Sequence, residues 1–238
     1  SKSKTTLLWD EYLRCRDYFR YIDYYNTTNE AFRFYEGDQW QGIRTYGERC
    51  ASLNILKPIV DYKVSTVALN TVCLYYSPLN YGSGYETMAQ ICEKLNAHAA
   101  KLWEKLKMDK LIWDIIQDAA ICGDGFLYFY DEDKSITAEN ISNVRVLFAD
   151  ETLSDIQKQP YILIEQRMDT DSAKNLARQN GIPKEEYALI APDEDEALRS
   201  EMQGYLSINK NKCTVVTKFY KKDGGVYIEK AAKNSAVM

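Results

Sequence analysis

Two glycines flank an aspartate at Gly123-Asp124-Gly125, where a stretch with helical periodicity gives way to an unbroken apolar run from Phe126 to Tyr130. A Gly-x-Gly pair can bind phosphate where it follows a strand and opens a helix, because the helix N-terminal amides hold the anion. Here the order is reversed, since the helix comes first. We therefore expect a structural hinge, in which Gly123 forms a left-handed helix cap and Gly125 allows a sharp turn into the strand.

An acidic group, Asp131-Glu132-Asp133, follows that apolar run. Clustered carboxylates are the ligands that hard divalent cations prefer, so Asp131 and Asp133 together with Asp124 could serve a metal-dependent hydrolase or transferase. No matching set of carboxylates lies nearby in the sequence. A solvated turn is therefore the favoured interpretation, and the metal-dependent enzyme is kept as an alternative.

Cysteine and histidine offer little further chemistry. The single histidine, His98, lies within a helical pattern and is expected to be a surface or packing residue, which leaves almost nothing for a histidine-based metal cluster or a catalytic triad. The widely spaced cysteines form no Cys-x-x-Cys pair and are typical of reduced, buried thiols; they are Cys15, Cys50, Cys73, Cys92, Cys122 and Cys213. The sequence also has no P-loop and no nucleophile elbow. We therefore expect no catalytic residue, no metal and no cofactor.

Aromatic residues are abundant, with 19 tyrosines, 7 phenylalanines and 4 tryptophans. Tyr35 and Trp40 lie on either side of a glycine turn at Gly37, which predicts a loop pinned by two rings. Because large aromatic side chains mostly serve burial, we expect both to pack in a core or against a neighbouring subunit. The alternative is a carbohydrate or protein recognition module that stacks its ligand on these rings.

The composition limits the class of protein. A chain of 238 residues can bury a core without disulfides or metals, and its net charge of −5 gives no general attraction to DNA or anionic membranes. No signal-peptide pattern opens the chain and no apolar run approaches the roughly 20 residues that cross a bilayer, so we expect a soluble protein. It begins at Ser1 without methionine and stops at Met238 just beyond a hairpin, so we expect a piece of a longer chain.

Hydrophobic periodicity predicts a mainly helical part over residues 1–122. The predicted helices are Leu7–Tyr25, Thr27–Gly37, a helix from Asn54 onward, Glu86–Lys107, and a helix from Asp109 up to Gly123. Thr27 and Glu30 are expected to form a capping box at the start of the second helix. Ile59, Val60, Val64 and Val67 are expected to form the buried face of the third helix. A strand is predicted at Val72–Tyr76 and a flexible loop at Tyr81–Tyr85.

Strand character dominates the second part, residues 123–238. The predicted strands are Phe126–Tyr130, Val144–Phe148, Tyr161–Glu165, Thr214–Tyr220 and Gly225–Glu229. Asp223-Gly224 is a hairpin signal between the last two. Two short helices, capped at Asp171 and started at Pro183, form an insert, and Asp193-Glu194-Asp195-Glu196 reads as a solvated charge run. The prediction is an α+β fold in one structural unit, with a mainly helical N-terminal half followed by a mixed or antiparallel sheet.

Several stretches, taken together with the aromatic N-terminal helix, resemble the N-terminal wing portion of a tailed-bacteriophage (or prophage) portal protein. They are Phe34–Trp40 (FYEGDQW), Asn54–Asp61 (NILKPIVD), Gly123–Tyr128 (GDGFLY), Gln159–Arg167 (QPYILIEQR), Ala173–Ala177 (AKNLA) and Asn180-Gly181. The resemblance covers most of the chain. It implies a fold like that of the portal wing.

The resemblance also implies a structural virion protein without enzymatic activity. Portal proteins form a homo-oligomeric ring of about twelve subunits, a dodecamer, at one capsid vertex. This head-tail connector is the passage for viral DNA packaging and genome ejection. Its partners are the terminase, which hydrolyses the ATP, and head-completion and capsid proteins, with no membrane involved.

The resemblance implies that the protein is located in the host cytoplasm during assembly and afterwards in the virion, at the portal vertex of the capsid. The stem, the clip and the channel loop come later in portal chains, so no DNA-contacting or terminase-contacting residue is assigned here. A mildly acidic balance suits a channel in which DNA must slide, because strong phosphate neutralisation would hold it in place.

Overall fold

A computed structural model describes residues 4–43, 47, 51–69, 73–78, 84–132, 135–193 and 211–238. Five sequence predictions therefore fall wholly or partly outside the described residues: Cys50, Val72 of the strand predicted at Val72–Tyr76, most of the loop at Tyr81–Tyr85, Asp133, and Glu194-Asp195-Glu196.

The chain forms two compact units. The sheet unit contains residues 1–28 and 144–238, and the helical unit contains residues 29–143. This division differs from the expected parts 1–122 and 123–238, because the first helix packs on the distant sheet and the strands after Gly123 belong with the helices. The class is α+β as predicted, with antiparallel pairing in both sheets.

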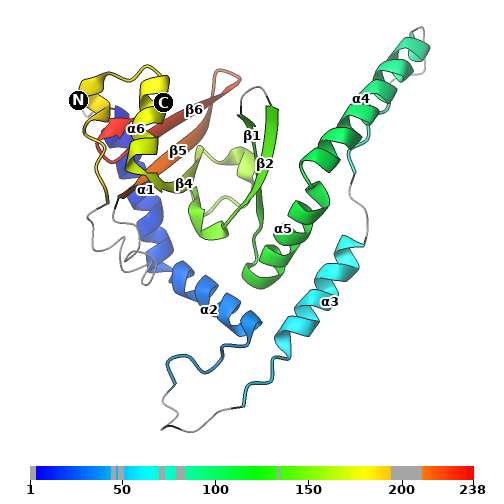
Figure 1. Ribbon diagram of the computed structural model, residues 1–238, viewed down its shortest axis with the longest axis horizontal. Helices are drawn as coiled ribbons and strands as arrows, with labels where there is room; N and C mark the ends of the chain where they lie inside the picture. The colour runs from blue at the N-terminus through cyan, green and yellow to red at the C-terminus, as the bar shows by residue number, and fades with distance from the viewer. Residues whose placement is uncertain are drawn as a thin grey trace. The chain divides into compact units, whose positions relative to one another are not determined.

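The sheet unit is built on five antiparallel strands in which every neighbour in space is also the neighbour in sequence. They are β3 (Val146–Phe148), β4 (Tyr161–Asp169), β5 (Lys212–Lys222), β6 (Gly225–Ala232) and β7 (Ser235–Ala236). Figure 1 shows β4, β5 and β6 side by side as the long strands of this sheet. A simple up-and-down order requires no crossover connection, so the alternation of side chains sets which residues face each side.

The hairpin between β5 and β6 forms at the predicted turn. Asp223 and Gly224 have φ angles of 50° and 78°, the left-handed pair that matches the twist of two antiparallel strands. Lys222 pairs with Gly225 directly beside this turn, and Val216 pairs with Ala231 farther along the hairpin. The turn residues therefore fix the register of the two strands.

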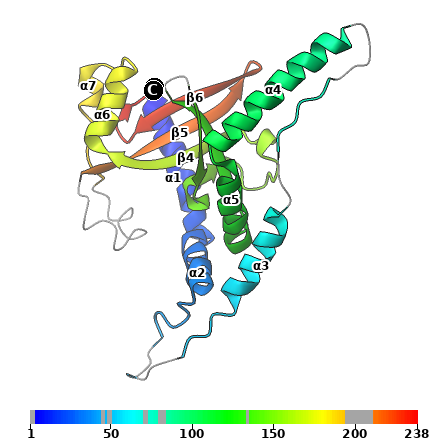
Figure 2. The same cartoon turned by 45° about the vertical axis from the view of Figure 1, so that its right-hand side comes forward.

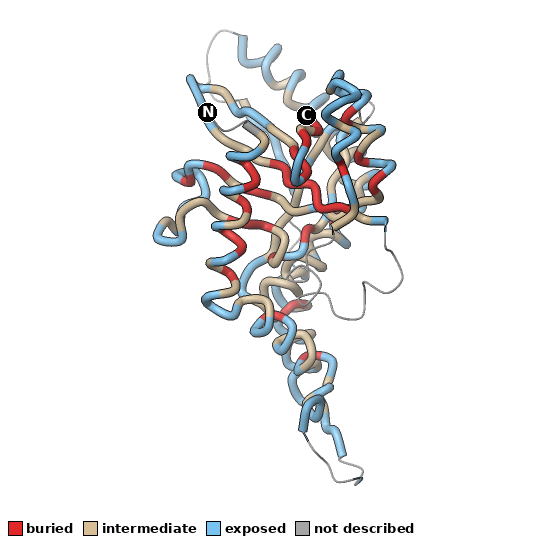
Figure 3. Tube along the Cα trace, turned by 90° about the vertical axis from the view of Figure 1, so that its left-hand side faces the viewer, coloured by how far each residue is buried: buried red, intermediate tan, exposed pale blue. Residues whose placement is uncertain are grey.

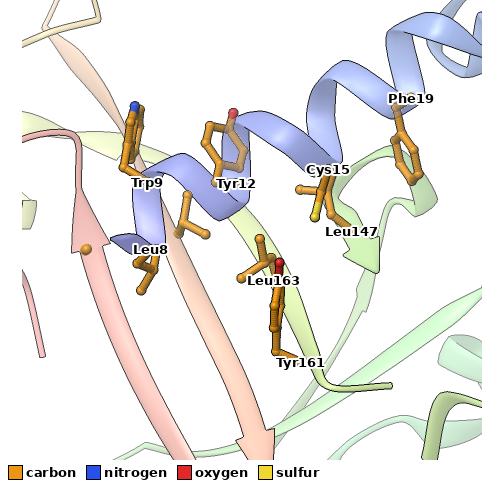
Figure 4. Close-up of a cluster of buried hydrophobic side chains, with 10 residues drawn as sticks. Leu8, Trp9, Tyr12, Cys15, Phe19, Leu147, Tyr161 and Leu163 are labelled. Atoms are coloured by element: carbon orange, nitrogen blue, oxygen red, sulfur yellow. The ribbon is translucent and has the colours of Figure 1, made fainter. Parts of the chain in front are cut away.

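One face of the sheet is covered by α1 (Lys4–Tyr21). Figure 4 shows side chains of α1 opposite those of the strands; the buried cluster is Leu8, Trp9, Tyr12, Cys15, Phe19, Leu147, Tyr161, Leu163, Val216 and Ala231. Polar contacts hold the helix as well. The Tyr12 hydroxyl donates to Glu165 at 3.0 Å, and the Lys218 ammonium pairs with Glu11 at 2.5 Å.

The opposite face is covered by α6 (Thr170–Gln179) and α7 (Lys184–Tyr187), which lie together in Figure 2. Adjacent residues of β5 divide between the two faces, since Val215 packs with α6 while Val216 packs with α1. The cap of α6 is Asp169, whose carboxylate accepts from the Asp171 amide at 3.1 Å. The predicted cap at Asp171 is thus wrong by two residues, because Thr170 already continues the helix.

The helical unit contains the rest of α2 from Asn29 and three further helices. The elements are α2 (Tyr24–Glu36), α3 (Leu56–Ala68), α4 (Tyr85–Lys105), α5 (Met108–Cys122), β1 (Phe126–Glu132) and β2 (Ser135–Ile141). Its two strands pair in full register as an antiparallel hairpin. Within the unit, α3 and the hairpin both contact α5.

Three sequence predictions for the helical unit and its entry are wrong or incomplete. Thr27 lies inside α2 instead of capping it, because the chain turns earlier, at Asp23 with a φ of 56°. Cys73–Tyr76 forms no strand; the backbone of Tyr76 pairs instead with the Asn96 side chain, at 2.7 and 3.0 Å. The strand β2 was not predicted, because its sequence SITAENI mixes polar and apolar residues without clear strand character.

Burial differs between the units. Figure 3 shows buried positions gathered in the sheet unit. The buried hydrophobic residues described in the helical unit are Tyr35, Val64, Met108 and Ile141. Its packed interior is therefore small in the part of the chain that the structure describes.

Truncating a central core residue should destabilise the sheet unit strongly. Leu163 is fully buried in β4, and Leu163→Ala is expected to lower the free energy of unfolding by about 2–5 kcal/mol, because it removes apolar contacts and leaves a cavity. Urea unfolding followed by circular dichroism measures this. The control Ile156→Ala removes a side chain that is 47% exposed, so it should change the free energy by less than about 0.5 kcal/mol. Equal effects of the two substitutions would contradict this packing.

Candidate functional site

Gly123 and Gly125 lie at the end of α5, and glycine is required at each for a different reason. Gly123 has a φ of 95° and its amide donates to the Ala119 carbonyl at 2.9 Å, so it forms a left-handed helix cap. Gly125 has no positive φ, but a Cβ there would lie 2.4 Å from the Ile115 carbonyl oxygen. The turn into β1 therefore packs directly on the backbone of α5.

Tyr35 lies in a polar cluster that joins three helices of the helical unit. Its hydroxyl donates to Asp61 of α3 at 2.6 Å and accepts from Gln117 of α5 at 2.5 Å. Lys57 lies 4.8 Å from the ring centroid and pairs with Glu36 at 3.1 Å. Burial and the Asp61 hydrogen bond raise the pKa of Tyr35 to about 12, so the hydroxyl stays protonated at neutral pH. This ring packs internally instead of forming an exposed stacking surface.

The loop after α2 is held by hydrogen bonds from side chains to backbone carbonyls. The Trp40 indole N–H donates to Ala51 at 3.2 Å, Ser52 donates to Gly37 at 2.7 Å, and the Asn54 amide donates to Tyr35 at 2.8 Å. Trp40 keeps 38% of its surface exposed. Its N–H is thus occupied while part of its ring is accessible, which suits packing against another molecule.

Sequence reasoning did not single out Asp61 and Gln117. Asp61 lies three residues before Val64, the buried residue of α3, so the two share one helix face. A carboxylate on an apolar face is the signal that could have identified the cluster. The expected buried face also included Ile59 and Val67, which are 46% and 55% exposed.

The candidate metal ligands and thiols are placed as follows. Asp124 and Asp131 are exposed, and no group of three His, Cys, Asp or Glu side chains gathers within the described ranges. The described cysteines are free; Cys15 and Cys213 are buried, whereas Cys73 is exposed, contrary to the expectation of burial. His98 lies exposed on α4.

Apolar side chains remain exposed along α3 and α4. Met88, Ile91 and Leu95 follow one another at helical spacing on α4 and are 52%, 48% and 41% exposed. No residue of this helix is buried. On α3, Ile59 and Tyr62 are 46% and 73% exposed. Such apolar surfaces typically mark a site of association with another molecule.

Comparisons with known proteins assign no family to this chain. No family model matches it, and no curated protein matches it either. Among the described helices, none combines the length and the apolar character that a membrane span needs. The candidate site is therefore defined by its geometry: exposed apolar residues on α3 and on α4 of the helical unit, with α3 held by the polar cluster around Tyr35.

The two glycines should respond differently to asparagine, which tolerates a left-handed backbone better than alanine does. At Gly123 a Cβ would meet no other atom, so only the left-handed backbone conformation opposes a substitution. Gly123→Ala should therefore lower the free energy of unfolding by about 1–2 kcal/mol, and Gly123→Asn by less. At Gly125, alanine, asparagine and valine should all be damaging, since any Cβ meets Ile115. Urea unfolding of the five variants measures this, and a well-tolerated Gly125→Ala would contradict the close approach.

Removing the Tyr35 hydroxyl should destabilise the helical unit. Tyr35→Phe is expected to lower the free energy of unfolding by about 1–3 kcal/mol, because Asp61 and Gln117 lose a buried partner. Tyr62→Phe alters an exposed tyrosine on α3 and is the control, expected to be near neutral.

Alkaline pH supplies a second readout of the Tyr35 hydroxyl. Its pKa is raised from 10.0 to about 12, so its contribution is complete below pH 10 and is lost as the pH rises toward 12. The stability difference between the native protein and Tyr35→Phe should therefore shrink across that interval. A constant difference would show that the neutral hydroxyl is not the cause.

Proposed function

We propose that this protein is a structural subunit of a ring-shaped portal, the head-tail connector through which double-stranded DNA enters and leaves a phage capsid. The sequence resemblance to the wing portion of portal proteins supplies the identity of the assembly. The exposed apolar surface of the helical unit is the observation that carries the proposal, because a ring subunit must keep such surfaces for its neighbours.

The energetics favour association of copies through α3 and α4. Burying apolar surface contributes about 25 cal/mol per Å², so each of the exposed side chains Met88, Ile91 and Leu95 can add about 1 kcal/mol when a neighbour covers it. A 21-residue helix with no buried residue gains little from its own chain. A neighbouring subunit would supply the missing burial.

The remaining features suit a structural role. The polar cluster at Tyr35 ties α3 and α5 to the end of α2, so the exposed apolar residues of α3 are presented on a braced set of helices. A net charge of −5 gives little attraction to the DNA phosphates, which suits passage of DNA without retention. The proposed ring lies at the capsid vertex. Its further partners are terminase, head-completion proteins and capsid proteins.

Self-association should depend on the apolar stripe of α4. The chain is expected to form discrete oligomers as its concentration rises, measured by sedimentation velocity, with rings that have a central hole in negative-stain images. The double variant Ile91→Asp/Leu95→Asp should weaken association at least tenfold, because it places charges in the buried interface.

The control for this experiment is Val226→Asp. Val226 is 66% exposed in the sheet unit, so Val226→Asp adds one negative charge to an apolar position outside the helical unit, against two in the α4 variant, and should leave association unchanged. A chain that stays monomeric at all concentrations contradicts the proposal. Equal weakening by both substitutions would exclude α4 as the interface.

A further inference from the structure

A cavity of about 160 Å³ lies within the sheet unit, between α1 and the far ends of β5 and β6. Trp9, Leu13 and Arg16 of α1 line one side, at positions i, i+4 and i+7 of the same helix. Cys213 and Thr214 of β5 line another side. Since one water needs roughly 10–15 Å³ of such volume, the space could hold on the order of ten waters or a small organic molecule.

The guanidinium of Arg16 is the unusual group in this cavity. Arg16 is only 3% exposed, and its Nε and Nη1 atoms are buried without a hydrogen-bond partner among the described residues. Its ring contact is with Tyr12, whose centroid lies 5.3 Å from the guanidinium carbon. Leaving two buried donors of a cation without acceptors is costly, so these two nitrogen atoms are suited to an acceptor from outside the described chain.

The acid nearest in the cavity wall is already engaged elsewhere. The Asp193 carboxylate accepts from the Thr214 amide at 3.1 Å and from the Thr214 hydroxyl at 2.8 Å. Lys233, which is exposed, also lines the cavity. Among the described residues of the cavity wall, two cations and one carboxylate leave one net positive charge, which a monoanion would balance.

We propose that this cavity binds a small aliphatic monocarboxylate, held by the Arg16 guanidinium. A carboxylate offers two oxygens that match the planar donors of arginine. The ligand's hydrocarbon part would contact the apolar wall formed by Leu13, Ile190 and Pro192. The doubly charged form of phosphate fits less well, because Asp193 lies in the same wall. This site is contained in the sheet unit and is independent of the proposed ring.

Nuclear magnetic resonance of the Arg16 Nε–H group, in the full ¹⁵N-labelled chain, tests the proposal directly. Sodium butyrate is expected to shift this signal with saturation, whereas sodium chloride at equal ionic strength, inorganic phosphate and butylammonium chloride should not. Saturation by butyrate alone supports a carboxylate site. Absence of a saturable butyrate response would mean that the cavity holds water only, and stronger binding of phosphate or any saturable binding of butylammonium would overturn the assignment.

Variants separate ligand binding from folding. Arg16→Met removes the charge while keeping much of the side-chain volume, and should weaken butyrate binding at least tenfold, measured as the ligand-induced rise in melting temperature. The control Arg20→Met removes an arginine of the same helix that pairs with Asp17 at 3.1 Å, and should leave binding unchanged.

A second variant keeps the test decisive if Arg16→Met does not fold. Leu189 lines the cavity and is 56% exposed, so Leu189→Asp should fold and should weaken butyrate binding severalfold by adding a negative charge. Unchanged affinity in both Arg16→Met and Leu189→Asp would refute the site.

Discussion

The packing of α1 on the sheet is the contact on which the sheet unit depends. Apolar side chains of this helix meet strands that lie more than a hundred residues later in the sequence. Two polar contacts fix its position at the same place, Tyr12 with Glu165 and Glu11 with Lys218. Without α1, Leu163 and Val216 would face solvent, because α6 and α7 cover only the opposite face. The helical unit is accordingly an insertion between α1 and β3.

Local signals in the sequence were sufficient for most elements of the fold. Asp223-Gly224 predicts the hairpin because the turn conformation depends on these residues themselves, and the periodicity of α4 and α5 identifies both helices. Pairing between distant segments left no such signal. The position of α1 on the sheet and the absence of a strand at Cys73–Tyr76, where Tyr76 pairs with Asn96, depend on which segments meet in space.

The candidate site was likewise only partly predictable from the sequence. The need for glycine at positions 123 and 125 could be predicted, but the reason at Gly125 could not, since it lies in the approach to Ile115. The role of Tyr35 as a packing residue was predictable from its type. Its partners Asp61 and Gln117, and the cavity around Arg16, combine residues that are far apart in the sequence and have no common motif.

The order of the chain also has a consequence for synthesis on the ribosome. α1 is made before the strands that cover it, and Ala231 of β6, part of the same cluster, follows more than two hundred residues later. At about 5–20 residues per second, that interval lasts roughly 10–45 seconds. During this time the stripe containing Leu8, Tyr12 and Phe19 is uncovered, while the helical unit, which is continuous in sequence, is already complete. The nascent chain therefore presents the apolar stripe of α1 to chaperones until the sheet is complete.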